Sequence, residues 1–132
     1  MSVVPDARRE STGEPFEYAL IRVVPRVERG EAMNAGVILY SQRPAYLGCR
    51  IELNTGRLRA LDPAADLAAV RAALAAVDTE CRRERRAGES PGTRFRWLTA
   101  TRSTIVQPGP VHGGLTADPA AELEHLFDAL VR

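Results

Sequence analysis

The sequence predicts an α+β protein in which an antiparallel sheet of about four to six strands packs against two main helices. Apolar residues alternate in the first part of the chain, where short turns separate successive strands. Apolar residues recur at helical spacing in the middle and at the end. With 132 residues, the chain is long enough for one domain with its own core and short for two.

Residues 1–14 are polar and lack periodicity, so we expect a disordered tail before a single domain over residues 15–132. The first strand begins at Phe16 and ends before Pro25, which lacks the N–H group that a sheet needs. Its two faces carry different apolar sets, Phe16, Tyr18 and Leu20 on one and Ala19, Ile21 and Val23 on the other.

Two further strands follow through short connections. A polar connection over residues 26–36 leads to the apolar run Val37–Tyr40, which is typical of a central strand. After a turn at Arg43-Pro44, alternation resumes from Tyr46 to Leu53 and places Cys49 on the apolar face. Because short turns join these strands, we expect an antiparallel meander.

The remaining β-structure is expected in short pieces. The turn signal at residues 54–56 precedes a short edge strand over residues 57–61. Alternation around Phe95 and Trp97 indicates another strand, and a last one is expected from Ser103 to Val106. A loop rich in Pro and Gly follows over residues 107–114.

Both predicted helices begin with an Asp-Pro pair. Asp62 and Asp118 are suitable N-caps, and proline is favoured at the first helical position. We expect both helices to cover one face of the sheet. Their apolar stripes are Leu67, Val70, Leu74, Val77 and Cys81 in the first helix, and Leu123, Leu126, Phe127, Leu130 and Val131 in the second.

The amino-acid composition limits the cellular compartment in which the protein is expected and the classes of chemistry that it can perform. No apolar run approaches the roughly 20 residues that span a bilayer, and no secretory signal is evident, so we expect a cytoplasmic protein that does not enter membranes. Cys49 and Cys81 are expected to be small core residues rather than a disulfide. All 18 basic residues are arginine, which excludes lysine chemistry. No P-loop, dinucleotide fingerprint or HExxH motif occurs, so we expect no cofactor.

Several blocks of the sequence together carry a family resemblance. They are Tyr18–Pro25, Glu28–Glu31, Asn34–Val37, Leu58–Leu61, Leu115–Thr116, Asp118–Pro119 and Leu126–Phe127. These blocks resemble small bacterial proteins grouped as domain-of-unknown-function family 3037, over about residues 16–131. The resemblance implies a bacterial cytoplasmic protein without an established reaction. It also implies a gene that often lies beside that of a HipA-like kinase, which makes such a kinase a candidate partner.

The connection after the first strand holds the first candidate site, made of Glu28, Arg29, Glu31 and Asn34. Two carboxylates near an arginine can perform acid–base chemistry or bind a divalent metal. The alternative, which we favour, is a tight loop in which the carboxylates pair with Arg26 or Arg29. In that loop Gly30 relaxes the backbone and Asn34 adopts an unusual dihedral.

The second candidate is the segment of residues 82–102, which has seven arginines, two glutamates and interleaved Phe95 and Trp97. Arginine with aromatics can bind a phosphate backbone and stack bases, although the whole chain is only +1. We favour a solvated face in which Arg94 and Arg96 point outward and the two aromatics are core. The candidate contacts to a ligand or partner are Arg22, Arg29, Asn34, Arg94, Arg96 and Arg102.

The third candidate is His112, which lies in a glycine-rich loop and could act as a general base. No nucleophile can be paired with it from the sequence, so we favour an exposed loop histidine. No metal site is expected, because two histidines and two cysteines without closely spaced pairs do not make one.

The sequence favours a non-catalytic protein-interaction or regulatory accessory domain. Four acids lie in the last helical segment whereas residues 82–102 are basic, and this asymmetry could bind a partner or drive self-association. The first alternative is binding of nucleic acid or another phosphate ligand through residues 82–102. The second is a small enzyme that uses Glu28, Glu31 or His112.

Overall fold

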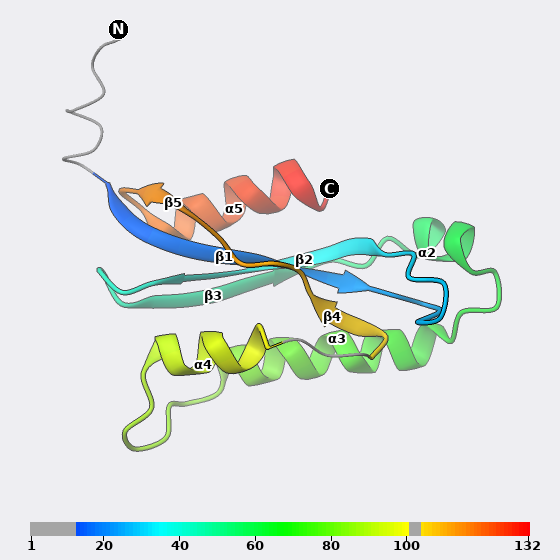
Figure 1. Cartoon of the computed structure of the whole chain (residues 1–132), viewed down its shortest axis with the longest axis horizontal. Coiled ribbons are helices and arrows are strands. Elements are labelled where there is room, and N and C mark those ends of the chain that lie inside the picture. Colours follow the sequence, from blue (N-terminus) through cyan, green and yellow to red (C-terminus); the bar gives the residue numbers. More distant parts are fainter. Residues whose placement is uncertain (1–12, 101–103) are drawn as a thin grey trace, which may run out of the picture.

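The computed structural model describes residues 13–100 and 104–132, and these residues form an α+β fold (Figure 1). The sheet is five-stranded and antiparallel. Its order is β3-β2-β1, and the other edge of β1 is shared by β5 at its N-terminal half and by β4 at its C-terminal end. The strands are β1 Glu14–Val23, β2 Met33–Ser41, β3 Tyr46–Ile51, β4 Val106–Pro108 and β5 His112–Thr116.

The sheet separates two apolar cores, as the alternation in the first strand predicts. One core contains Ala19, Ile21 and Val23 of β1, and the other contains Phe16 with Tyr18 and Leu20 packed against it. The central strand β2 contributes to both cores, with Ile38 on the first side and Leu39 on the second. A strand that is apolar on both sides needs cover on both sides.

The helices provide that cover from opposite faces. α3 (Leu67–Arg82) and α4 (Pro91–Leu98) pack on the first core, whereas α5 (Pro119–Leu130) packs on the second (Figure 1). The expectation that both main helices share one face is therefore wrong. Each predicted apolar stripe does face the sheet, with Val70, Leu74 and Cys81 buried in α3 and Leu123 and Phe127 buried in α5.

The segment between β3 and α3 differs from the prediction. Residues 57–61 belong to a helix, α2 (Thr55–Leu61), because the Asn54 side chain accepts a hydrogen bond from the Arg57 N–H at 2.9 Å and caps it. α3 begins at Leu67 with Asp66 as its cap, four residues later than expected. Asp62 instead ends α2, and its carboxylate accepts from the backbone of Ala64.

Residues 91–98 form α4 and not a strand. Ser90 accepts a hydrogen bond from the Thr93 N–H at 3.1 Å, and Pro91 occupies the start of the helix. Phe95 is fully buried, as expected, but Trp97 is 59% exposed. Arg94 is 4% exposed, so the expectation that Arg94 and Arg96 both face solvent is wrong for Arg94. The alternation of residues 94–97 is compatible with a strand, but Ser90 as the cap and Pro91 as the first residue favour a helix.

Smaller differences concern strand ends. β1 begins at Glu14, inside the expected tail, and β2 begins at Met33, inside the expected connection. Ser103 of the last predicted strand lies outside the described residues; β4 runs over Val106–Pro108, and β5 forms within and beyond the predicted loop 107–114. In the described residues, no helix combines the length and apolar character needed to cross a membrane.

Candidate functional site

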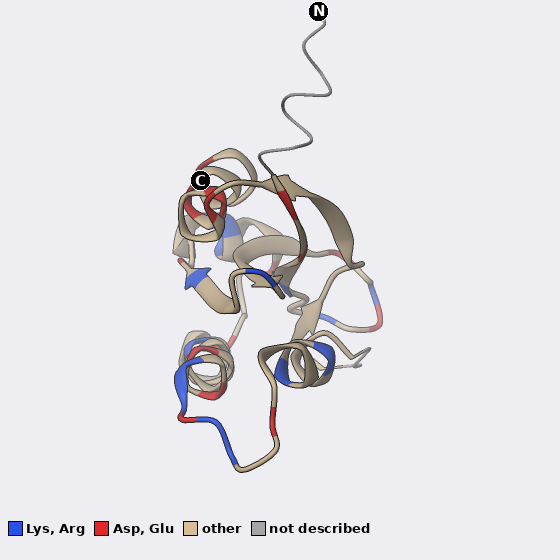
Figure 2. Cartoon of the chain, turned by 90° about the vertical axis from the view of Figure 1, so that its left-hand side faces the viewer, with Lys and Arg blue, Asp and Glu red and all other residues tan. Residues whose placement is uncertain are grey.

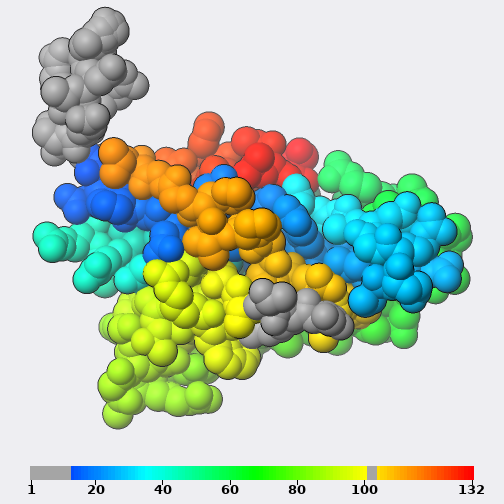
Figure 3. Space-filling model, viewed as in Figure 1, coloured from blue at the N-terminus to red at the C-terminus, as the bar shows by residue number. Residues whose placement is uncertain are grey.

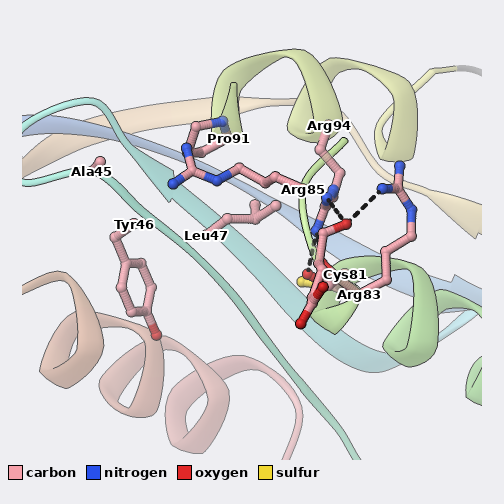
Figure 4. A pocket seen from close by; sticks show the side chains of 9 residues that line it. Ala45, Tyr46, Leu47, Cys81, Arg83, Arg85, Pro91 and Arg94 are labelled. Carbon is pink, nitrogen blue, oxygen red and sulfur yellow. Dashed lines mark hydrogen bonds between the residues drawn. The ribbon is translucent and has the colours of Figure 1, made fainter. Parts of the chain in front are cut away.

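A buried arginine from α4 closes the C-terminal end of α3. The Arg94 guanidinium donates hydrogen bonds to three backbone carbonyls, those of Cys81, Arg83 and Glu84. The last carbonyls of a helix lack partners within it, and a planar guanidinium offers several N–H donors in a fixed geometry. Figure 4 shows Arg94 directed from α4 toward the end of α3. The side chain therefore joins the two helices.

Glu89 holds the loop between α3 and α4 around this arginine. Its carboxylate accepts from the Arg83 guanidinium at 3.0 and 2.8 Å and from Arg94 at 2.6 Å. The Arg86 backbone N–H also donates to it at 3.0 Å. The hydrogen bonds from Arg83, then Arg94, hold the pKa of Glu89 well below its ordinary value. The loop is thus fixed by an ion-pair network.

A pocket of about 340 Å³ lies on one side of this network. Its wall from β3 includes Tyr46 and Leu47, and its other wall includes Cys81 and Arg94. We call it the Tyr46 pocket. Figure 4 shows Arg85 extending above Leu47 toward Pro91, so a guanidinium overhangs a partly apolar hollow.

A second hollow, of about 230 Å³, lies on the other side of Arg83 and Arg94. We call it the Trp97 groove, since Trp97 of α4 lines it together with Arg86. The loop between α3 and α4 projects from the body of the molecule (Figure 3). The outward-facing groups that border the two hollows are named the arginine surface and are Arg85, Arg86 and Trp97.

Most arginines of this region are already neutralised within the chain. Arg82 pairs with Asp78, Arg83 with Glu80 and Glu89, Arg94 with Glu89, and Arg96 with Glu17. In the described ranges, Arg85 and Arg86 have no ion pair. Figure 2 shows the basic loop at one end of the molecule and the acidic residues of α5 at the other. Within the described residues, the α3–α4 loop therefore carries two consecutive arginines that no carboxylate neutralises.

The carboxylates after β1 lie apart from this surface. Arg26 binds Glu28 at 3.0 Å and Arg29 binds Glu31 at 2.9 Å, and all four side chains are solvent-exposed. The hydrogen bond from Arg26 lowers the pKa of Glu28. Each carboxylate therefore pairs with a neighbouring arginine, and Gly30 adopts a positive φ of 71° in the turn, whereas Asn34 does not take the predicted place in this loop.

Asn34 and His112 are not brought into that loop. Asn34 lies in β2 rather than in a turn, and its amide donates to the Leu130 carbonyl at 3.0 Å. His112 lies in β5 opposite Tyr18, at a ring distance of 5.3 Å. Tyr18 is well before the end of β1, whereas the Glu28 loop follows that end. The expected enzyme site is thus divided between separate parts of the sheet.

The remaining candidate contacts are also dispersed. Arg22 lies in β1 with its guanidinium against Gly109, so that a methyl group added at Gly109 would come within 3.1 Å of it. Arg96 binds Glu17 through two hydrogen bonds of 3.0 and 2.8 Å. Arg102 lies outside the described residues. Within the described ranges, no group of three or more His, Cys, Asp or Glu residues is arranged to hold a metal ion.

The sequence interpretation missed the buried role of Arg94 and the exposure of Trp97. Both follow from the helical period of α4, in which Arg94 lies one turn before buried Leu98 and Trp97 lies one turn after exposed Thr93. A signal was present in Ser90-Pro91, which has the same cap-then-proline order as Asp118-Pro119 before α5. No local signal identifies the carbonyls that Arg94 reaches, since they belong to another helix.

Comparison with known proteins agrees with the resemblance seen in the sequence. Residues 18–131 match the model of a family described as a protein of unknown function, DUF3037. No curated protein and no solved structure matches the chain. Since the family match covers most of the sequence, the chain belongs to the DUF3037 family.

Proposed function

We propose that this chain is a non-catalytic protein-interaction domain that binds an acidic segment of a partner through the arginine surface. The observation that carries the proposal is Trp97, which is 59% exposed on a helix that is anchored by its buried residues Phe95 and Leu98. Tryptophan and arginine are the residues most enriched at energetic hot spots of protein interfaces. A rigid anchor also reduces the entropy lost on binding.

Charge defines the chemistry of the partner. Arg85 and Arg86 lack acidic partners in the described residues, and both border hollows next to apolar or aromatic groups. A partner segment with acidic residues beside an apolar one would pair with these guanidinium groups and cover Trp97. The family resemblance suggests a HipA-like kinase as the first partner to test.

Nucleic-acid binding through the same region is the weaker alternative. A phosphate backbone is bound by many unneutralised cations, and each one contributes to the salt dependence of affinity. Arg82, Arg83, Arg94 and Arg96 are instead bound to carboxylates of the same chain. Two outward arginines beside Glu84 make a small positive patch rather than a continuous path.

The catalytic alternative has less support. Glu28 and Glu31 are exposed and paired with neighbouring arginines, and His112 lies on a different strand. General acid–base catalysis needs its groups within hydrogen-bond reach of one reacting atom. These residues do not meet that condition together.

The test is binding of the purified full chain to a HipA-like kinase, measured by calorimetry. Trp97→Ala should weaken binding by about 30-fold or more, the equivalent of a hot spot of at least about 2 kcal/mol. Arg86→Glu should weaken it further at low salt, because a repulsive charge replaces an attractive one.

Arg57→Glu is the matched control, since Arg57 is an exposed helical arginine on α2, away from the arginine surface. It should leave the affinity unchanged. Equal binding by wild type and Trp97→Ala would contradict the proposed surface. Binding of single-stranded DNA or RNA that Arg85→Ala and Arg86→Ala weaken, without any protein partner, would support the nucleic-acid alternative.

A further inference from the structure

Two cysteines that are distant in sequence meet between β3 and α3. Cys49 of β3 is 3% exposed and Cys81 of α3 is 4% exposed, and both are free thiols in the same apolar core. On α3, Asp78 accepts from the Cys49 thiol and Arg82 donates to the Cys49 carbonyl, so the face of α3 that carries Cys81 lies against Cys49. A disulfide forms only between thiols that the backbone already brings this close.

The two thiols differ in their access to small molecules. Cys81 lines the Tyr46 pocket, which has a volume of about 340 Å³, whereas Cys49 does not line it. Figure 4 shows the Cys81 sulfur among the side chains of this pocket. An oxidant of the size of hydrogen peroxide can therefore reach Cys81 first.

Polar groups surround the pair on the side of α3. The Cys49 thiol donates to the Asp78 carboxylate at 3.3 Å, and Arg82 donates to the same oxygen at 2.7 Å. Burial raises the pKa of Asp78, but the hydrogen bonds from Arg82 and Cys49 outweigh this and leave it lowered. Asp78 is thus an ionised acceptor of the hydrogen bond from Cys49.

The two neighbouring thiols differ in acidity. The pKa of Cys81 is lowered by the adjacent Cys49, and nearby Arg82 and Arg94 add to this effect against the cost of burial. The adjacent Cys81, followed by burial, raises the pKa of Cys49. A thiolate is the reactive form of cysteine, so the thiol that reaches the pocket is also the one that ionises first.

We propose that Cys81 and Cys49 form a reversible intramolecular dithiol–disulfide pair, in which Cys81 reacts with hydroperoxides from the Tyr46 pocket and Cys49 resolves the product. The Cys81 thiolate attacks one peroxide oxygen, an S–O bond forms, and the O–O bond breaks to give a sulfenic acid and hydroxide or alkoxide. That leaving oxygen takes up a proton from water.

In the second step, the Cys49 sulfur attacks the Cys81 sulfur. The S–S bond forms, the S–O bond breaks, and hydroxide leaves. The leaving hydroxide takes up the Cys49 proton and becomes water. Two thiols are oxidised by two electrons and one hydroperoxide is reduced, and a dithiol such as dithiothreitol reverses the change.

The test uses the purified, reduced full chain treated with hydrogen peroxide. The intact mass should fall by two hydrogen atoms, the protein should stay monomeric on a non-reducing gel, and neither thiol should react with iodoacetamide after unfolding. Dithiothreitol should restore both thiols. Full alkylation of both cysteines after peroxide treatment, or disulfide-linked dimers in place of the internal bond, would overturn the proposal.

Two variants separate the roles of the sulfurs. In Cys49→Ser, Cys81 should stop at the sulfenic acid and give an adduct with dimedone. In Cys81→Ser, Cys49 should stay reduced under the same treatment, because it neither lines the pocket nor ionises readily. Oxidation of Cys49 in Cys81→Ser at the wild-type rate would contradict the assigned order. The wild-type mass change stands as the test even where a variant does not fold.

Discussion

Replacement of Arg94 by methionine should destabilise the fold far more than its position in an arginine-rich segment suggests. The guanidinium serves three carbonyls and the Glu89 carboxylate. Arg83 also donates to the Glu84 carbonyl and to Glu89, so those two acceptors keep a partner. The substitution therefore removes the hydrogen bonds to the carbonyls of Cys81 and Arg83, and it removes the ion pair between Arg94 and Glu89.

The expected cost can be worked out from these contacts. Two acceptors left without a side-chain donor cost about 1–2 kcal/mol each, and the loss of a largely buried ion pair adds about 1–2 kcal/mol. The Arg94 Nε is buried and has no hydrogen-bond partner in the described residues. Because methionine lacks this buried donor, the substitution recovers about 1 kcal/mol of stability. The net loss should be about 3 kcal/mol, which is a large part of a total stability of about 5–15 kcal/mol.

The assay is urea unfolding followed by circular dichroism, with the midpoint and slope compared between variants. Arg96→Met is the matched control, because it lies on the same helix and makes an exposed pair with Glu17. Its loss should be below about 1 kcal/mol. A similar small change in both variants would refute the role assigned to Arg94.

Three further predictions concern other parts of the structure. Because the folded-state pKa of Glu89 lies below its ordinary 4.5, its stabilising effect is complete above that pH and is lost as the pH falls below it; urea unfolding across a pH series should show a flatter acid dependence in Glu89→Gln. Gly36→Ala should cost about 2 kcal/mol or more, since the added methyl would lie 2.7 Å from a backbone carbonyl of β3. Gly113→Ala, whose nearest neighbour is at 3.5 Å, should change stability by less than about 0.5 kcal/mol in the same assay. Phe95→Ala should cost about 3–5 kcal/mol and Trp97→Ala less than about 1 kcal/mol; equal costs in thermal unfolding would contradict the helical phase of α4.

The sheet was predictable because its strands carry a strong period-two signal. In β1, the alternation assigns Ile21 to one core and Leu20 to the other, and the structure has the same assignment. The same alternation also indicates that the helices must lie on both faces of the sheet. A strand with apolar residues on both faces requires cover from both sides, so helices on one face alone would leave Phe16 and Leu39 exposed.

The short helices were not predictable from apolar spacing alone. α2 has only Leu58 buried, so no apolar stripe marks it as a helix. In α4, one turn carries Arg94, Phe95, Arg96 and Trp97, and this order satisfies a strand as well as a helix. The decisive information is in the caps, Asn54 before α2 and Ser90 before α4.

The candidate site was only partly predictable because it depends on contacts between elements. The arginine-rich segment was identified, but Glu17, which pairs with Arg96, lies on β1, and the loop geometry brings Glu89 onto two arginines at once. Spacing in sequence does not show which charges meet. The contact between Cys49 and Cys81 has the same origin, since it requires α3 to end over β3.

The arrangement of the arginines also limits where a function can lie. An arginine that hydrogen-bonds the end of α3 or pairs with a neighbouring carboxylate stabilises the fold. Its replacement should therefore lower the free energy of unfolding more than it lowers the affinity for a partner. Arg85 and Arg86 form no ion pair in the described residues. Trp97 contributes little to the core because most of its surface is exposed. A binding defect without a stability defect should therefore occur at these three residues and not at Arg83 or Arg94.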